Sequence, residues 1–259
     1  MKVAVIGCGV MGAAFARQWA KKGDELYLCD HSQEKGGALA SELKGRFFSS
    51  AKEAVQGVDL ILFSVKPKDL EKTAAEIGKL DEHILMSILS GTTCEKLRKT
   101  FEGGHVVRSM PNLALTEGES VIALVRDEAL PDTVVSKVDK LLEGMGLIFW
   151  TEERNIDAVA ALAGSGPAFI LAMIEALVES GVVMGLSATQ SKDLALQTIL
   201  GAVALLKARP DSHPGEIRWQ ICSPGGTTIA GMRAFEEAGV RAGIMDTILA
   251  TYWRAKEPH

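Results

Sequence analysis

The chain has 259 residues, of which 47% are hydrophobic and 24% are charged, and this composition excludes disordered and fibrous proteins. The net charge of −5 excludes broad electrostatic binding of nucleic acid, which requires a basic surface. The length exceeds that of a typical single domain, so we expect two domains.

The cysteines and the apolar runs lead to further expectations. The cysteines are scattered along the chain without a CxxC pair, so we expect free thiols and no metal site. The apolar runs are short, and the stretch of residues 168–178 carries Glu175, so we expect no membrane-spanning helix. The first residues lack the long apolar core of a signal peptide. These features predict a cytoplasmic protein with no membrane partner.

In the first half of the chain, short β-rich apolar runs alternate with amphipathic stretches, which predicts βαβ units around a parallel sheet. The expected strands are residues 2–6, 25–29, 60–65, 84–89, 106–110 and 120–124. The expected helices have apolar residues at three- and four-residue spacing and are residues 11–22, 33–44, 67–80, 93–101 and 132–143.

After about residue 151 the strand signal ends and long helical patterns rich in Ala, Leu, Ile and Val follow. The expected helices are residues 156–162, 167–184, 189–208, 228–237 and 240–256. Because these helices are apolar over more than one face, we expect them to be buried against a partner chain as well as against their own domain.

A glycine-rich loop, residues 7–12, follows the first expected strand and opens the first expected helix. The first glycine permits a tight turn, the second lets the backbone approach a pyrophosphate, and the third allows close packing of helix on strand. The helix N-terminus offers unpaired N–H groups to the phosphates. We therefore predict a Rossmann-type domain that binds NADPH or NADH through Gly7, Cys8, Gly9, Val10, Met11 and Gly12.

Asp30 ends the second expected strand, where a carboxylate can accept hydrogen bonds from the adenosine ribose and would repel the extra phosphate of NADP. His31, Ser32 and Lys35 follow and could hold that phosphate, so the choice between NADH and NADPH stays open. Asp30 can also be interpreted as a cap of the next helix. We assign Asp30 and His31 to the cofactor site.

Three further strand ends lie at the edge where open α/β sheets bind ligands. We expect cofactor contacts from Ser64, Val65, Lys66 and Pro67, although Lys66 is also consistent with a surface lysine. The residues expected to flank the nicotinamide are Ser90, Met110, Pro111 and Asn112.

A second loop, residues 223–228, precedes an expected helix in the second half. Gly225 and Gly226 free the backbone to present N–H groups, and Thr227 and Thr228 begin a helix whose N-terminus favours an anion. A small carboxylate fits such a site. The alternative is a Pro-Gly-Gly turn with threonine as the helix N-cap.

With these motifs the chain resembles the pyrroline-5-carboxylate reductase family over nearly its whole length. The most specific match is residues 223–231, SPGGTTIAG. Residues 157–168 and the tripeptide Val65-Lys66-Pro67 are similar to two other family stretches, and His213-Pro214-Gly215 has the spacing seen in many relatives. Three motifs in order, spread over both halves, are more specific than the glycine loop alone.

The resemblance implies reduction of the cyclic imine pyrroline-5-carboxylate to L-proline by NADPH or NADH, the last step of proline biosynthesis. It implies that Thr228 bonds the ring nitrogen and that Glu153 lies at the pocket edge. The residues implied to bind the substrate carboxylate are Ser223, Gly225, Gly226 and Thr227.

The resemblance also implies a homodimer with interlocking helical domains, which some relatives assemble into larger rings. The expected architecture is an α/β, Rossmann-type parallel-sheet domain, residues 1–151, followed by an all-α helical dimerisation and substrate-binding domain, residues 152–259. Two positions depart from many relatives: Cys222 replaces threonine or serine, and Ala51 replaces asparagine.

Two other functions are consistent with parts of the sequence. A two-domain hydroxy-acid dehydrogenase would share the first half, but it needs a lysine or histidine as acid/base, and no motif in the helical half supplies one. A nucleotide-sensing protein without turnover would need the glycine loop alone.

Overall fold

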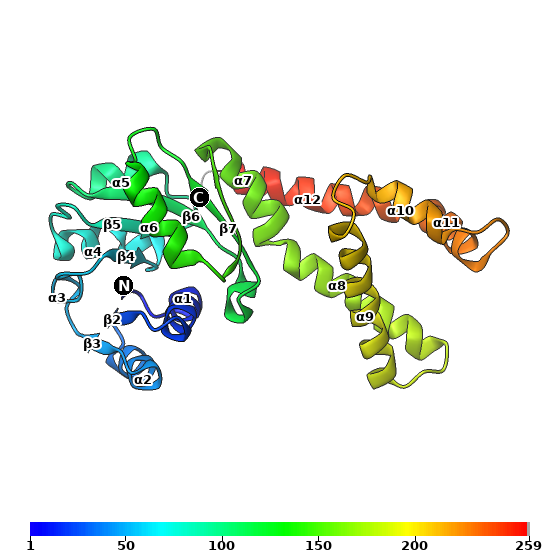
Figure 1. The fold of residues 1–259 in the computed structure, drawn as a ribbon, viewed down its shortest axis with the longest axis horizontal. Helices are drawn as coiled ribbons and strands as arrows, with labels where there is room; N and C mark the ends of the chain where they lie inside the picture. Colours follow the sequence, from blue (N-terminus) through cyan, green and yellow to red (C-terminus); the bar gives the residue numbers. More distant parts are fainter. Residues whose placement is uncertain (258–259) are drawn as a thin grey trace. The chain divides into compact units, whose positions relative to one another are not determined.

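Eight strands form one sheet in the first part of the chain (Figure 1). The computed structural model describes residues 1–257 and gives the strand order β3-β2-β1-β4-β5-β6-β7-β8. The strands are β1 Lys2–Ile6, β2 Glu25–Cys29, β3 Arg46–Phe48, β4 Leu60–Phe63, β5 Ile84–Ser87, β6 His105–Met110, β7 Ser120–Val125 and β8 Gly146–Thr151.

The expected parallel sheet is confirmed apart from one edge. β7 runs antiparallel to β6 and parallel to β8, so the sheet is mixed. The sequence patterns did not predict β3, β8 or the helix α3, Ala51–Ala54. β3 and α3 are too short to show a periodicity, whereas β8 contains the apolar run Leu147-Ile148-Phe149-Trp150, a strand signal that the sequence prediction did not use.

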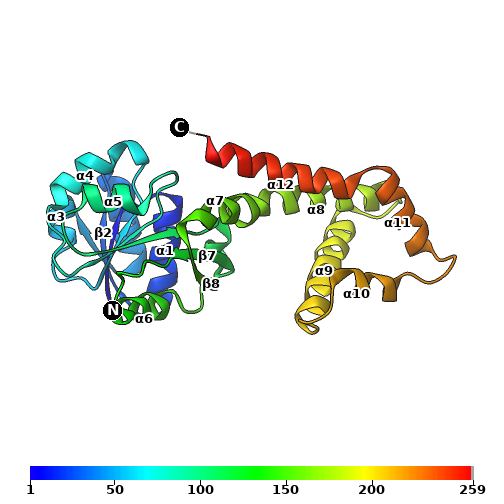
Figure 2. The same ribbon diagram turned by 90° about the horizontal axis from the view of Figure 1, so that it is seen from above.

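Helices cover both faces of the sheet (Figure 2). One apolar cluster joins the sheet to α1 Val10–Lys21, α2 Gln33–Leu43 and α6 Asp132–Leu142. A second cluster joins the other face to α3, α4 Leu70–Ile77 and α5 Cys94–Thr100. Because both faces are buried, the central strand β4 reads Leu-Ile-Leu-Phe, without polar alternation.

The strand order changes its direction across the sheet between β1 and β4: β2 and β3 follow on one side of β1, and β5 to β8 follow on the far side of β4. β1 pairs with β2 on one side and with β4 on the other, so the connections that leave the two central strands turn to opposite sides. Open α/β sheets bind ligands in the crevice that such a reversal creates at the carboxyl ends of the strands. The glycine loop after β1 and the segment after β4 both lie at this edge.

The chain separates into two compact units, Met1–Gly164 with the chain end from Arg254, and Ser165–Trp253. The expected boundary after residue 151 lies at the end of β8, and residues 258–259 of the expected second domain lie outside the described residues.

Short helices follow the sheet strands: η1 Pro67–Asp69, η2 Leu113–Glu117, η3 Glu153–Asn155, α7 Ile156–Val159 and a π-helical turn, Ala160–Gly164. The long helical patterns are confirmed as α8 Gly166–Val183, α9 Ala188–Lys207, α11 Thr227–Glu237 and α12 Val240–Lys256, and α10 Pro214–Ile221 is additional.

The second unit has almost no interior of its own. α8 and α9 pack together, yet the buried residues of Ser165–Trp253 are only Gly181, Ser191, Ala195 and Ile217. Large apolar side chains remain exposed, among them Leu171 at 63% and Leu200 at 61%. Since hydrophobic stabilisation is proportional to the apolar area removed from water, this unit gains little of it as a single copy.

One helical segment is longer and more apolar than the sequence analysis indicated. The continuous segment Glu153–Val183 contains an 18-residue window with a mean hydropathy of 1.8, which is long and apolar enough to cross a membrane by length and composition. The reason is that Glu175 lowers the average too little to interrupt the run. A helix of this length and composition can be covered either by a lipid bilayer or by a protein partner.

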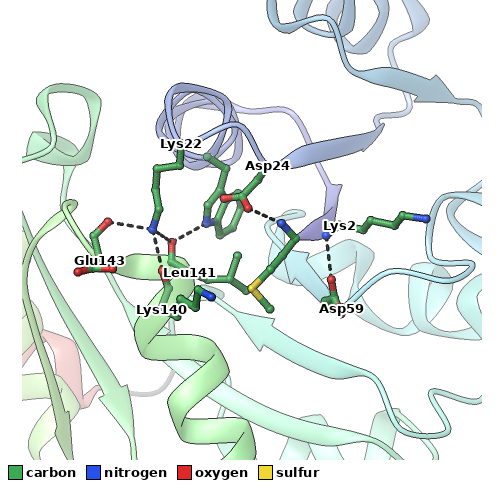
Figure 3. Close-up of polar contacts among 9 residues, drawn as sticks. Lys2, Lys22, Asp24, Asp59, Lys140, Leu141 and Glu143 are labelled. Carbon is green, nitrogen blue, oxygen red and sulfur yellow. Dashed lines mark hydrogen bonds and ion pairs between the residues drawn. The ribbon is translucent and has the colours of Figure 1, made fainter.

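Lys22 and Trp19, at the end of α1, cap the C-terminus of α6 (Figure 3). The Lys22 Nζ donates to the carbonyl oxygens of Lys140, Leu141 and Glu143 at 2.7, 3.0 and 3.0 Å. The Trp19 Nε1 donates to the Leu141 carbonyl at 3.0 Å. These oxygens have no partner within α6, and a cation also interacts favourably with the helix dipole there.

We predict that Lys22→Met lowers the free energy of unfolding by about 1 kcal/mol, because it removes three charge-assisted hydrogen bonds at a partly exposed site. Urea denaturation at a fixed protein concentration measures this. The matched control is Lys21→Met in the same helical turn, which should change the free energy by less than about 0.5 kcal/mol. Equal losses in both variants would contradict the capping role.

Candidate functional site

The glycine loop has no space for a side chain at two of its three glycines. Gly7 has a φ of +100°, and a Cβ added there would lie 2.6 Å from the backbone oxygen of Ser64. A Cβ on Gly12 would lie 2.0 Å from the carbonyl oxygen of Gly7. The loop is therefore packed directly against the end of β4.

Gly9 differs from the other two glycines because a Cβ there would meet nothing within 4 Å. Gly9 is the N-cap of α1, and no side chain caps this helix end. The first N–H groups of α1 are thus free to bind a ligand, and the space above Gly9 lets that ligand approach the backbone. This arrangement fits the pyrophosphate of a dinucleotide.

A cleft of about 560 Å³ opens beside this loop. Seven of the predicted cofactor residues line it: Gly7, Gly9, Asp30, His31, Ser64, Val65 and Lys66. The other predicted cofactor residues are not among its lining residues: Cys8, Val10, Met11, Gly12, Pro67, Ser90, Met110, Pro111 and Asn112. The structure therefore brings the ends of β1, β2 and β4 to one cleft, as expected for a dinucleotide site.

Asp30 binds the protein backbone with both carboxylate oxygens. Its Oδ2 accepts the N–H of Cys8 at 2.7 Å, and its Oδ1 accepts the N–H of Ser32 at 2.8 Å. The side chain is only 7% exposed. Asp30 thus holds the glycine loop to the end of β2. The cap of α2 is Ser32, whose hydroxyl accepts the N–H of Lys35, so the interpretation of Asp30 as the cap is wrong.

Ser64 and Cys8 also serve the loop itself. The Ser64 hydroxyl lies 2.6 Å from the carbonyl oxygen of Gly7, to which it donates. Burial, together with the nearby Asp30 and Cys29, raises the pKa of the Cys8 thiol to about 12. A thiol that stays protonated at neutral pH is a poor nucleophile, which supports a packing role for Cys8 over a redox role.

Asn112, predicted to flank the nicotinamide, is buried and bound within the first unit. Its side-chain Nδ2 donates to the carbonyl oxygen of Ala163 at 2.9 Å, and its Oδ1 accepts the N–H of Ala114 at 3.2 Å. Asn112 therefore ties the end of β6 to the π-helical turn Ala160–Gly164.

Sequence reasoning missed the wall of the cleft formed by η1 and α4. The additional lining residues there are Lys68, Asp69, Lys72, Thr73 and Glu76. The four-residue spacing of Lys68, Lys72 and Glu76 was a signal that these side chains share one helix face. Glu76 Oε1 also accepts the N–H of Ala51 at 2.7 Å, at the position where asparagine was expected.

Glu153 lies in a polar cluster with Arg108 and the start of α5. Its Oε1 accepts hydrogen bonds from the Arg108 guanidinium at 2.8 Å and from the Cys94 N–H at 2.7 Å. Arg108 is 9% exposed and Glu153 is 34% exposed. Burial alone would raise the pKa of the Glu153 carboxyl, but the bonds from Arg108 and Cys94 outweigh burial and lower it.

The second loop is present in the helical unit and opens α11. Gly225 has a φ of +66°, and Gly226 is the N-cap of α11 without any side-chain cap. The interpretation of a threonine as N-cap is therefore wrong. The first N–H groups of α11 remain available to an anion, beside the half-buried Thr228.

Sequence comparisons identify relatives of both parts of the chain. Residues 153–258 match the family model described as pyrroline-5-carboxylate reductase dimerisation. Residues 2–91 match the model described as NADP oxidoreductase coenzyme F420-dependent. The chain is 38% identical to the pyrroline-5-carboxylate reductase of Aquifex aeolicus, over 99% of this chain and 97% of that protein. The chain belongs to the pyrroline-5-carboxylate reductase family.

Solved structures of this family have the same fold. The chain is similar to the pyrroline-5-carboxylate reductase of Streptococcus pyogenes with a TM-score of 0.88 and 29% identity, covering 99% of this chain and 98% of that one. The Plasmodium falciparum enzyme, solved with NADP bound, gives a TM-score of 0.86 at 27% identity and covers 99% and 97% of the two chains. The expected α/β fold with a helical dimerisation domain is thereby confirmed.

We predict that Gly9→Ala leaves the fold intact but weakens NADP⁺ binding at least about tenfold, because the new methyl group occupies the space through which the pyrophosphate reaches the backbone. Gly12→Ala should instead lower the unfolding free energy, since its Cβ would overlap the Gly7 carbonyl. Urea denaturation and calorimetric titration separate the two effects. Unchanged NADP⁺ affinity in Gly9→Ala would contradict the assigned site.

The Glu153 cluster predicts an acid-dependent loss of stability. Because the folded-state pKa is below the ordinary value of 4.5, the stabilisation is present above pH 4.5 and is lost as pH falls through the folded pKa. Glu153→Gln should therefore lower the unfolding free energy by about 1 kcal/mol at pH 7, with a smaller difference from wild type at pH 3.5. The control is Glu152→Gln; a difference for Glu153→Gln that does not depend on pH would refute the assignment.

Proposed function

We propose that this chain reduces the cyclic imine 1-pyrroline-5-carboxylate to L-proline with NADPH or NADH, the last step of proline biosynthesis. The observation that carries the proposal is the uncapped N-terminus of α11 beside Thr228, in a chain whose other unit has the dinucleotide cleft. The family membership over the full length supports the same assignment.

The residues of the cleft fit a nicotinamide dinucleotide. The open space at Gly9 and the uncapped α1 N-terminus suit a pyrophosphate, and the ends of β2 and β4 suit the adenosine. When bound, the reduced nicotinamide supplies a hydride. We propose that all of the cofactor residues expected from the sequence contribute to binding the dinucleotide. Those that line the cleft would contact it directly.

The helical unit supplies groups for the other substrate. Backbone N–H groups of residues 223–227 hold the substrate carboxylate, because the N-terminus of α11 favours an anion. The Thr228 hydroxyl bonds the ring nitrogen and can serve as donor or acceptor as the nitrogen changes its protonation. Since a protonated imine carbon is already electrophilic, these residues act mainly by fixing its orientation. We also propose Glu153 as a substrate-binding residue.

We further propose that the nucleotide-binding domain ends at residue 151 and that the domain after it associates with a second copy of the chain. The match to a dimerisation domain over residues 153–258 supports homo-oligomerisation. The exposed apolar side chains of α8 and α9 need such a cover, so we assign the apolar segment Glu153–Val183 to a protein interface and not to a bilayer. We also propose that dimers assemble into larger rings and that the protein is located in the cytoplasm.

The reaction is tested by following oxidation of NADPH and of NADH with pyrroline-5-carboxylate and by detecting proline as the product. Imine-dependent oxidation with stoichiometric formation of proline is the expected result. Tight binding of the nucleotide without any oxidation when the imine is added would reject the proposed reaction and favour a nucleotide-sensing role.

We predict that Thr228→Ala lowers turnover about ten- to a hundredfold, the effect of losing one hydrogen bond worth about 1–3 kcal/mol in the transition state. Thr228→Ser keeps the hydroxyl and should retain most activity. The matched control is Thr227→Ala, which keeps the backbone N–H that binds the carboxylate and should change turnover by less than about threefold. Turnover is measured with saturating cofactor, and wild-type activity of Thr228→Ala would rule out its catalytic role.

A further inference from the structure

The carboxylate of Glu76, near the C-terminal end of α4, is held in place at the wall of the cofactor cleft. Its Oε1 accepts the N–H of Ala51 at 2.7 Å. Ala51 is the first residue of α3, whose N-cap Ser50 makes no side-chain cap, so Glu76 provides an acceptor that α3 lacks. Glu76 and Ala51 both line the cleft. The bond engages one carboxylate oxygen and leaves acceptor capacity on the other.

The position of Glu76 corresponds to the adenosine end of the cleft. Gly7 and Gly9, which suit the pyrophosphate, follow β1. Burial, together with the nearby carboxylates of Glu76 and Asp30, raises the pKa of the Cys29 thiol at the end of β2 to about 11. Cys29 lines the cleft as well. Since the adenosine of a dinucleotide extends from the pyrophosphate across the end of the second strand, Glu76 lies on the side of the base.

A carboxylate at this place can distinguish one purine from another. Adenine presents an amino donor at position 6 beside the acceptor N7, whereas a 6-oxo purine presents two acceptors there. An ionised carboxylate only accepts hydrogen bonds, so it bonds the 6-amino group and repels a 6-oxo group. Thr73 lies three residues before Glu76 on the same face of α4 and also lines the cleft. Its hydroxyl can donate to N7.

We propose that Glu76 selects adenine as the base of the dinucleotide by accepting a hydrogen bond from its 6-amino group, while the Thr73 hydroxyl donates to N7. The inference rests on the proposed dinucleotide-dependent function. In this arrangement the Ala51 N–H holds the carboxylate before the ligand arrives, so little side-chain freedom is lost on binding. Glu76 therefore stabilises α3 and determines the specificity for the base.

The experiment is calorimetric titration at pH 7.0 of NADP⁺, and of its analogue with hypoxanthine in place of adenine, into the full chain. The measured quantity is the ratio of the Kd for the hypoxanthine analogue to the Kd for NADP⁺. Hypoxanthine carries a 6-oxo group, so wild type loses one hydrogen bond and gains a repulsive contact. We expect a ratio of about ten or more.

The test variant is Glu76→Gln, which keeps the bond to Ala51. Its amide oxygen accepts the Ala51 N–H, because the amide nitrogen only donates, and the amide NH₂ is left for the base. A donor there suits the 6-oxo group and not the 6-amino group. We expect the ratio to fall at least about tenfold from the wild-type value. The change in net charge acts on both dinucleotides and cancels in the ratio.

The matched control is Glu71→Gln, which removes the same charge from α4 at a position that does not line the cleft. It should leave the ratio within about twofold of wild type. Thr73→Val should weaken binding of both dinucleotides about threefold or more and leave the ratio unchanged, because N7 is an acceptor in both bases. Urea denaturation checks that Glu76→Gln keeps the stability of the fold.

Three results would overturn the role of Glu76. The first is equal affinity of wild type for the two dinucleotides. The second is a wild-type ratio in Glu76→Gln, including the case in which both affinities fall by the same factor, as expected for a contact with a ribose hydroxyl. The third is an equal change of the ratio in Glu71→Gln. Unchanged affinities in Thr73→Val would overturn the contact of Thr73.

The binding experiment distinguishes this inference from the proposed reaction. A chain that binds NADP⁺ with the expected base ratios but does not reduce the imine would refute the reaction and still support the role of Glu76. A chain that reduces the imine but binds both bases equally would refute the role of Glu76 alone. Binding of neither dinucleotide would overturn both.

Discussion

The close approach of the glycine loop to the ends of β2 and β4 is the constraint on which the first unit depends. The Ser64 hydroxyl and the Asp30 carboxylate bind the loop backbone, and no Cβ fits at Gly7 or Gly12. This packing aims the N-terminus of α1 at the cleft and leaves Gly9 open above it. Asp30 and Ser64 therefore have two roles, because they hold the loop and also line the cleft.

This double role changes the interpretation of Asp30. An acid at this position suggests ribose binding and a preference against a 2′-phosphate. In the structure its carboxylate first satisfies two backbone N–H groups, which makes it a structural residue whose charge is nevertheless felt in the cleft. A substitution at Asp30 would thus change the loop and the electrostatics of the cleft together.

The second unit has the opposite physical problem. Its helices have the length and apolarity expected, but they bury few side chains within one copy of the chain. The free energy that orders them must then come largely from association, and stability becomes dependent on protein concentration. In the proposed dimer, the partner chain would cover the segment Glu153–Val183, which has the hydropathy of a membrane helix.

The βαβ pattern, the glycine loop, the long helices and the family could be predicted from the sequence, because apolar periodicity and glycine motifs are local properties. Only the tertiary structure showed the antiparallel pair β6–β7, the cleft wall with Lys68 and Lys72, and the buried bonds of Asn112 to Ala163. It also showed Arg108 bound to Glu153, two residues far apart in sequence. These partners lie on segments far apart in the sequence and meet only through tertiary packing, so no local sequence pattern predicts them.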